Sequence, residues 1–122
     1  LDSPRLLTPG FALRDEPRLF FAGQMTGVEG YMESAASGLL AGENAARAAL
    51  GLPPLTLPRD TMTGALAAYI SDPSVADFQP MGANIGLLPP LTGEPIRDKR
   101  LRYAAMAERA LKSLALAAGD AI

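Results

Sequence analysis

The longest regular pattern in the chain is a run of small and apolar residues over 30–50, which predicts a helix. Gly51 is expected as its C-cap, and Pro53 and Pro54 prevent the helix from continuing. A short, continuously apolar run over 19–22 precedes it and predicts a buried strand of the kind found inside parallel sheets. A glycine-containing loop over 24–29 is expected to join the two.

Two further helices are predicted. The first covers 61–70, with Asp60 or Thr61 as N-cap, and the second covers 96–118, where apolar residues recur at helical spacing. The stretch over 74–95 contains turn residues with interspersed apolar side chains and predicts an ordered, packed loop. A lone strand cannot form a sheet, so we expect its partners in a longer polypeptide or another molecule.

The composition narrows the chemistry. The 122 residues are 48% hydrophobic and 20% charged, with net charge −2, typical of a folded globular protein. There is no Cys and no His, which excludes thiolate nucleophiles, imidazole acid–base catalysis and Cys/His metal sites from this segment. We therefore predict neither catalytic residues nor metal ligands here. No apolar run reaches the roughly 20 residues needed to cross a bilayer, so no membrane association is expected.

Three glycines, Gly23, Gly27 and Gly30, lie between the predicted strand and helix. Glycine can adopt positive φ, and a helix N-terminus presents free N–H groups that favour a phosphate or another electron-rich oxygen. Small residues then recur at helical spacing along one predicted face of the helix: Ser34, Gly38, Gly42 and Ala45/Ala46. Such a face allows close approach by a sheet, a helix or a flat cofactor. Close helix-on-sheet packing without any ligand remains an alternative.

Two stretches resemble a known family. "LFFAGQMTGVEGYMESAASGLLAGENAAR", residues 19–47, and "FQPMGANIGLLPPL", residues 78–91, are similar to two signatures of the folate-dependent tRNA uracil-5-methyltransferases, the flavoproteins called TrmFO. The glucose-inhibited division protein A family is related and similar. The resemblance implies an α/β fold: the C-terminal fragment of an FAD/NAD(P)-binding Rossmann-type, glutathione-reductase-like flavoprotein. This segment would be mostly helical with one short core strand.

The resemblance also implies a domain organisation. Residues 1–51 would complete the FAD-binding domain with the strand, the glycine loop and the small-residue helix. Residues 52–95 would form a Pro/Gly-rich connector with a short helix and a packed loop. Residues 96–122 would form the C-terminal helix.

The activity implied is methylation of C5 of a T-loop uridine in tRNA, in the cytoplasm. FAD would be the cofactor, and NAD(P)H and 5,10-methylenetetrahydrofolate the co-substrates. The partners would be tRNA and the remainder of the same polypeptide, and the isolated segment would be inactive. Two alternatives stay open: a division-protein-A-like flavoprotein that modifies the tRNA wobble uridine, and a non-catalytic helical interaction module.

Site residues follow from the resemblance by position. The expected FAD-binding residues are those of the glycine loop and the helix start: Gly23, Gln24, Gly27, Val28, Glu29, Gly30 and Tyr31. Tyr31 and Glu33 are also candidates for contact with folate or the target base, although simple packing and a solvated acid are the alternatives. Asn84 is a further substrate candidate, with a turn residue as its alternative.

Basic residues crowd the start of the last predicted helix. Arg97, Lys99, Arg100 and Arg102 are candidate tRNA phosphate contacts. Cations at a helix start oppose the helix dipole mildly, which favours an external anion, but a solvated helix face is the alternative.

Overall fold

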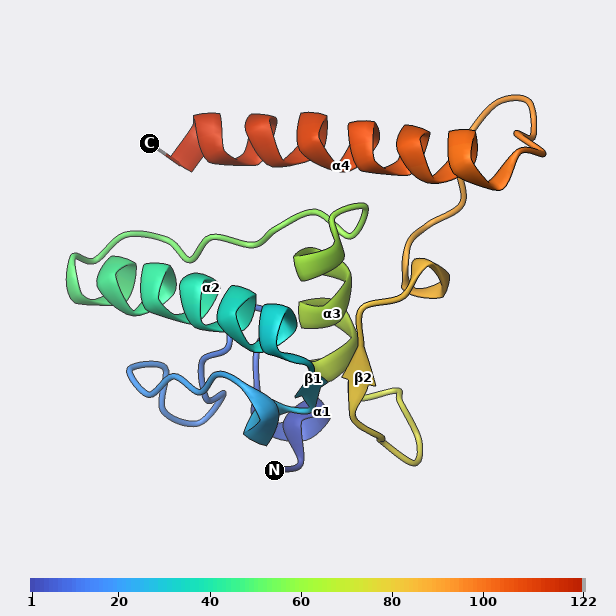
Figure 1. Cartoon of the computed structure of the whole chain (residues 1–122). Helices are drawn as coiled ribbons and strands as arrows, with labels where there is room; N and C mark the ends of the chain where they lie inside the picture. The colour runs from blue at the N-terminus through green and yellow to red at the C-terminus, as the bar shows by residue number, and fades with distance from the viewer. Residues whose placement is uncertain (122) are drawn as a thin grey trace.

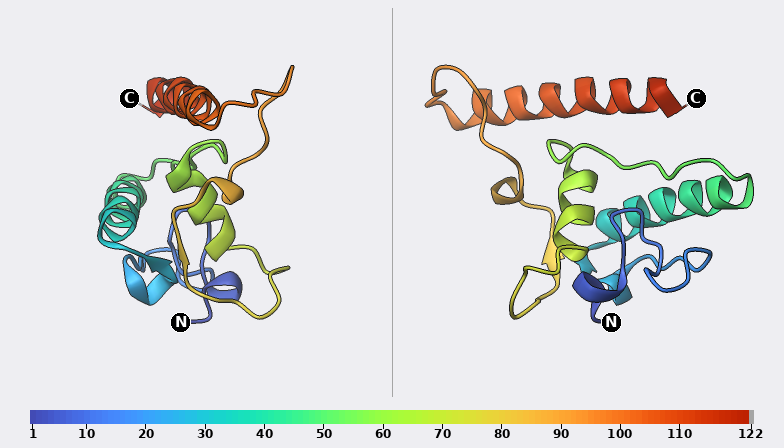
Figure 2. Two further views of the ribbon diagram at one scale, coloured as in Figure 1. Left: turned by 45° about the vertical axis from the view of Figure 1, so that its right-hand side comes forward. Right: turned by 180° about the vertical axis from the view of Figure 1, so that it is seen from behind.

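The computed structural model describes residues 1–121, with side chains up to Ala117. Its elements, in chain order, are α1 (Ser3–Leu6), the 3-10 turn η1 (Gln24–Thr26), β1 (Val28–Glu29), α2 (Tyr31–Ala49), α3 (Met62–Ile70), β2 (Met81–Gly82), the 3-10 turn η2 (Ile85–Leu87) and α4 (Lys99–Ala121). Helices α2 and α3 pack against the N-terminal loops and the small sheet, while α4 lies across the opposite side (Figures 1 and 2). Ile122, the end of the predicted C-terminal segment, lies outside the described residues.

The core forms where α2 and α3 meet the N-terminal segment. It contains Leu7, Phe11, Val28, Leu40, Ala41, Leu66, Ala67 and Ile70, each buried to at least 95%. Partly buried side chains from the loops pack around this cluster, among them Phe20, Phe78 and Met81. Phe78 and Met81 belong to the 74–95 stretch, so the prediction that this loop packs against the core is confirmed for these two residues.

Helix α2 agrees with the predicted bounds to within one residue at each end. Gly30 is its N-cap with φ 108°, and Leu50, rather than the predicted Gly51, is its C-cap. Gly51 follows with φ 72°, a left-handed conformation that glycine adopts without a Cβ penalty. The buried stripe consists of Ser37, Leu40, Ala41 and Asn44, the spacing expected of one helical face.

The predicted small-residue face of α2 is not the face that packs. Gly38 and Gly42 are exposed, and a Cβ built on either glycine would meet nothing within 4 Å. The stripe around Leu40 is buried instead: Leu40 packs in the core, and the polar Ser37 and Asn44 on the same face have hydrogen-bond partners. Within residues 1–121, therefore, no element makes the close approach that this face would permit.

The predicted strand over 19–22 is wrong. Leu19 is 51% exposed, and Phe20 makes only an isolated antiparallel bridge with Ala12. A strand needs a regular ladder of hydrogen bonds to a neighbouring strand. The 19–21 stretch makes only a few such bonds with the N-terminal loop, for example from Phe21 N to Phe11 O at 3.0 Å. The regular pairing lies further along: β1 pairs in parallel with β2, with Val28 opposite Met81 and Glu29 opposite Gly82.

Helix α3 confirms the predicted cap. Thr61 is the N-cap, and its hydroxyl accepts a hydrogen bond from Gly64 N at 3.0 Å. The same hydroxyl donates to Pro58 O at 2.6 Å, which holds the preceding connector against the helix start. Gly64 packs directly on that connector, and a Cβ there would collide with the carbonyl oxygen of Pro58.

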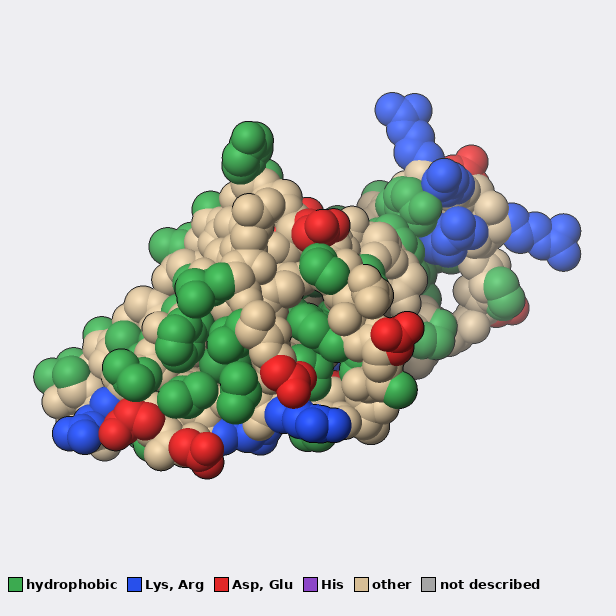
Figure 3. Space-filling view, turned by 90° about the horizontal axis from the view of Figure 1, so that it is seen from below, with side chains coloured by type: hydrophobic (Ala, Val, Ile, Leu, Met, Phe, Trp, Pro, Cys, Tyr) green, Lys and Arg blue, Asp and Glu red, His purple; other side chains and the backbone are tan. Residues whose placement is uncertain are grey.

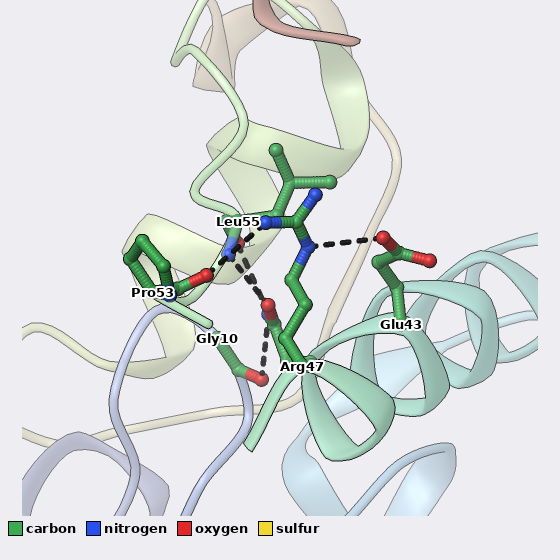
Figure 4. Close-up of polar contacts among 6 residues, drawn as sticks. Gly10, Glu43, Arg47, Pro53 and Leu55 are labelled. Atoms are coloured by element: carbon green, nitrogen blue, oxygen red, sulfur yellow. Dashed lines mark hydrogen bonds and ion pairs between the residues drawn. The ribbon is translucent and has the colours of Figure 1, made fainter. Parts of the chain in front are cut away.

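One buried amide, that of Asn44, joins three segments, and Figure 4 labels its partners Gly10 and Leu55. Asn44 is 1% exposed, and its Nδ2 donates to Gly10 O at 3.3 Å and to Leu55 O at 3.0 Å. Its Oδ1 accepts from Leu55 N at 2.6 Å. Next to it on α2, Arg47 pairs with Glu43 at 2.9 Å and donates to Pro53 O. These contacts hold the N-terminal loop and the 52–60 connector along α2.

Helix α4 begins at Lys99, three residues after the predicted start. The Asp98 carboxylate accepts hydrogen bonds from Arg100 N at 2.9 Å and Leu101 N at 3.1 Å, so Asp98 is the N-cap. Further along, Arg109 donates to the carbonyls of Pro89 and Pro90, and Ser113 donates to Asp60 at 2.6 Å. These polar contacts and the buried Met106 hold α4 against the rest of the chain.

Candidate functional site

The glycine loop brings the two resembling stretches together. Its three glycines, Gly23, Gly27 and Gly30, all have positive φ, as their spacing suggested. Gly27 lies directly against the Phe78 ring, where a Cβ could not fit, and Gly27 O accepts from Met81 N at 2.7 Å. The structure therefore places the second stretch beside the first through backbone contact, which no spacing rule had foretold.

The predicted FAD-binding residues divide into two groups. Val28 is 1% exposed and belongs to the core, and Gly27 is buried under Phe78. Gly23 N donates to the Ser37 hydroxyl at 2.8 Å, so this donor is already used within the chain. These three residues shape the loop, whereas Gln24, Glu29, Gly30 and Tyr31 are exposed.

An open depression of about 270 Å³ lies at the start of α2, lined by Gln24, Gly30, Tyr31 and Ser34. Tyr31 is 97% exposed and Gly30 contributes only backbone. The first N–H bonded within the helix is that of Ser34, which donates to Gly30 O at 3.0 Å. The N–H groups of the preceding turn have no carbonyl within the helix to bond. The site thus offers amide donors, a phenol and a hydroxyl to a ligand with electron-rich oxygens or nitrogens.

The substrate candidates occupy different surroundings. Tyr31 is free to meet a ligand, but the Glu33 carboxylate lies over Gly30 and accepts a hydrogen bond from Ala83 N at 3.1 Å. The Asn84 amide donates to Gly82 O and to the Met81 sulfur, both at 3.3 Å. These are local turn contacts.

The four basic candidates lie at the start of α4, on the end of the molecule where blue side chains project in Figure 3. Arg97, Lys99 and Arg100 are exposed, and Arg102 is half-buried. Within the described chain none of the four has a carboxylate within ion-pair distance, and Asp98 is engaged as the helix cap. Lys99 and Arg102 each lie 5.5 Å from the centre of the Tyr103 ring.

Ser34 and Ser37 were not singled out as site residues by the sequence reasoning. Ser37 fixes the turn by accepting from Gly23 N, and its own hydroxyl donates to Ser34 O at 2.7 Å. The available signal was its position three residues before Leu40 on the same helical face, which predicts burial of a polar group that needs a partner.

Over residues 1–121, no group of three or more acidic side chains is placed to hold a metal ion. Among the same residues, no helix combines the length and the apolar character needed to cross a membrane.

Comparison with known proteins supplies the relationship. The family model described as "Glucose inhibited division protein A" matches residues 1–53. A protein named methylenetetrahydrofolate–tRNA-(uracil-5-)-methyltransferase TrmFO from Lactiplantibacillus plantarum is 60% identical over 114 residues, 93% of this chain. Proteins of the same name from Symbiobacterium thermophilum and Pelotomaculum thermopropionicum are 59% and 56% identical over 94% and 93% of the chain.

The chain spans about a quarter of the length of these curated relatives, 26% in each case. The resemblance expected from the two stretches is confirmed, since the identity extends over more than nine-tenths of the chain. Over more than nine-tenths of its length, this chain is therefore similar to one part of the proteins named TrmFO.

Proposed function

We propose that this chain is the C-terminal segment of a flavin- and folate-dependent enzyme that methylates C5 of a T-loop uridine in tRNA. The names of its relatives support this proposal, since they specify methylenetetrahydrofolate, tRNA and the uracil 5-position. The full enzyme would be a glutathione-reductase-like flavoprotein of the cytoplasm that takes its electrons from NAD(P)H. The isolated chain would be inactive.

One observation in the structure supports a cofactor-binding role: the open depression at the start of α2. The flavin pyrimidine edge carries carbonyl oxygens and ring nitrogens that accept hydrogen bonds, and negative charge grows there on reduction. The first-turn N–H groups of α2 and the positive end of its dipole suit such an edge. Gly30 adds no side chain to the depression, and the space that its Cβ would fill is taken by the Glu33 carboxylate. The residues present therefore fit FAD.

In this proposal Gln24, Gly30 and Tyr31 contact the cofactor, with Ser34 as an added donor. Gly23, Gly27 and Val28 hold the loop in shape, while Glu29 remains an exposed candidate. FAD, once bound and reduced, supplies the electrons that turn the one-carbon unit of the folate into a methyl group. The chain's own part is to orient the ring and stabilise negative charge at its edge.

The outer face of α2 supports the proposal that more polypeptide covers this segment. Tyr31, Met32, Leu39 and Leu50 are between 74% and 97% exposed, and Glu43 is the only charged residue among the exposed positions of the helix. A helix face with so few charges is typical of an interface. We infer that the remainder of the same polypeptide packs there, because the relatives are about four times as long.

The start of α4 supports a tRNA contact. Its four cations, Arg97, Lys99, Arg100 and Arg102, lack carboxylate partners within the described residues, so an external phosphate can pair with them without breaking an ion pair. Reversing the charge of Arg97 and Arg100 together should weaken tRNA binding and reduce the salt dependence of the affinity by about two phosphate contacts. Unchanged affinity at low salt would leave the cluster as a solvated face.

The cofactor proposal is tested on the complete polypeptide by its absorption spectrum and by FAD titration. Replacing Tyr31 by Ala should weaken FAD binding about tenfold without lowering thermal stability, because this side chain is 97% exposed and contributes little to packing. Asp15→Ala, which removes an exposed side chain of the N-terminal loop, is the control. A polypeptide that shows no flavin absorption and does not bind FAD in the titration would favour the helical interaction module instead.

A further inference from the structure

The carboxylate of Glu33 occupies a small cradle made by two glycines and one backbone amide. A Cβ on Gly30 would lie 2.5 Å from Glu33 Oε1 and 2.6 Å from Oε2, and a Cβ on Gly82 would lie 3.4 Å from Oε2. Ala83 N donates to the same Oε2 at 3.1 Å. The half-buried carboxylate therefore lies where only glycine at position 30 leaves room for it.

This contact joins segments that are 50 residues apart in the chain. The sheet that also joins them has only two residues in each strand, Val28–Glu29 and Met81–Gly82, and so provides little pairing. On the other side of β1, the contact of Gly27 with Phe78 and Met81 fixes the beginning of the second segment. Beyond Gly82, the hydrogen bond from Ala83 N to the Glu33 carboxylate attaches the second segment to α2.

The position of Glu33 on α2 favours a charged group. With Gly30 as N-cap, Glu33 is the third helical residue, so its carboxylate lies in the first turn near the positive end of the helix dipole. Hydrogen bonds to charged groups are stronger than those between neutral ones. Glu33 does not line the depression formed by Gln24, Gly30, Tyr31 and Ser34, but it lies directly over Gly30, which does.

We propose that Glu33 is a positioning residue rather than a ligand contact: it ties the 82–84 segment to the first turn of α2 and thereby fixes the wall of the depression. Its effect on FAD binding rests on the function proposed above, but the tie itself does not. Without it, the 82–84 segment can move away, and Gly30, at φ 108°, has no side chain of its own to keep its conformation. The depression would then lose its shape, and a rigid ring would bind less tightly.

Two variants distinguish the effect of the length of the Glu33 side chain from the effect of its charge. Glu33→Gln keeps an acceptor oxygen at the same distance but loses the charge, whereas Glu33→Asp keeps the charge but is one methylene too short to reach Ala83 N. Hydrogen exchange of the Ala83 amide measures the tie, and FAD titration of the complete polypeptide measures its effect on binding. We expect Glu33→Asp to speed Ala83 exchange and weaken FAD binding, each about tenfold, and Glu33→Gln to stay within about threefold of wild type in both.

The outcomes distinguish the explanations. If Glu33→Asp behaves as wild type while Glu33→Gln loses affinity, charge rather than the tie matters and the proposal is overturned. Ala83 exchange that is unaffected in Glu33→Asp would also overturn it. If wild type does not bind FAD but Ala83 exchange responds as expected, the tie stands and the proposed function fails. Asp15→Ala, which removes an exposed carboxylate of the N-terminal loop, should match wild type in both measurements.

Discussion

The buried amide of Asn44 gives the most direct test of how this chain is held together. Replacing it by Ala removes all three of its hydrogen bonds, to Gly10 O and to both backbone groups of Leu55. The three backbone groups lose their partner beside a cavity of about 260 Å³ that Asn44 itself lines, although the side chain is only 1% exposed. The N-terminal loop and the 52–60 connector thereby lose their shared contact with α2 (Figure 4).

The expected loss follows from the contacts. Each hydrogen bond contributes about 1 kcal/mol net, so three of them amount to about 3 kcal/mol of unfolding free energy. The bond at 2.6 Å between Leu55 N and Oδ1 is the shortest and should account for the largest share. Asn44→Asp keeps this acceptor but turns a carboxylate toward two carbonyl oxygens, so it should destabilise at least as strongly as Asn44→Ala.

Urea unfolding measures the effect. With an m-value of about 1.5 kcal/mol/M, a loss of about 3 kcal/mol lowers the unfolding midpoint by about 2 M. Asn84→Ala is the matched control, because this exposed amide makes only local contacts at 3.3 Å, and it should cost less than about 0.5 kcal/mol. A midpoint shift below about 0.3 M for Asn44→Ala, or a wild-type midpoint for Asn44→Asp, would refute the claim that the hydrogen bonds of Asn44 stabilise the fold.

Three other variants test separate contacts. Gly64→Ala should lower the unfolding free energy by about 2 kcal/mol, because the collision of its Cβ with the connector exceeds the helix-propensity gain of about 1 kcal/mol; increased stability would contradict this. Arg109→Met removes both bonds to the 89–90 carbonyls, so amide exchange in α4 should rise about tenfold while that of α2 stays constant. Hydrogen bonds from the Ser74 hydroxyl and amide lower the pKa of Asp72, so this carboxylate stabilises the fold above its unfolded pKa of about 3.9, and the contribution is lost as pH falls through the folded pKa. Ser74→Ala should raise the pKa of Asp72 in an NMR titration, and an unchanged value would argue against the hydroxyl as the main cause.

Local chemistry made part of the fold predictable. The cap of α3 by Thr61 and the end of α2 just before Gly51 depend on residues within four positions of the helix end, so the sequence shows them directly. The positive φ of the glycine loop follows for the same reason, since few other residues tolerate it. The late start of α4 was missed because the Asp98 carboxylate caps the helix more effectively than the apolar Ile96 that precedes it.

The candidate site was predicted only in part. The exposed start of α2, with Gly30 and Tyr31, lies where the resemblance implied a cofactor contact, although the contact itself stays a prediction. The folding of Glu33 onto Ala83 could not be read from the sequence, because it depends on two segments 50 residues apart meeting at one point. The hydrogen bond from Gly23 N to the Ser37 hydroxyl could not be predicted for the same reason, because it also depends on how two separate segments meet.

By itself, the sequence determined the bounds of α2 and the cap of α3, which chemistry the segment lacks, and which proteins it resembles. Those properties depend on neighbouring residues and on composition. Tertiary structure decided which face of α2 is buried, where the two parallel strands pair, and which polar groups are already bonded within the chain. Burial and strand pairing are relations between distant segments, so their free energies appear only when those segments are brought into contact.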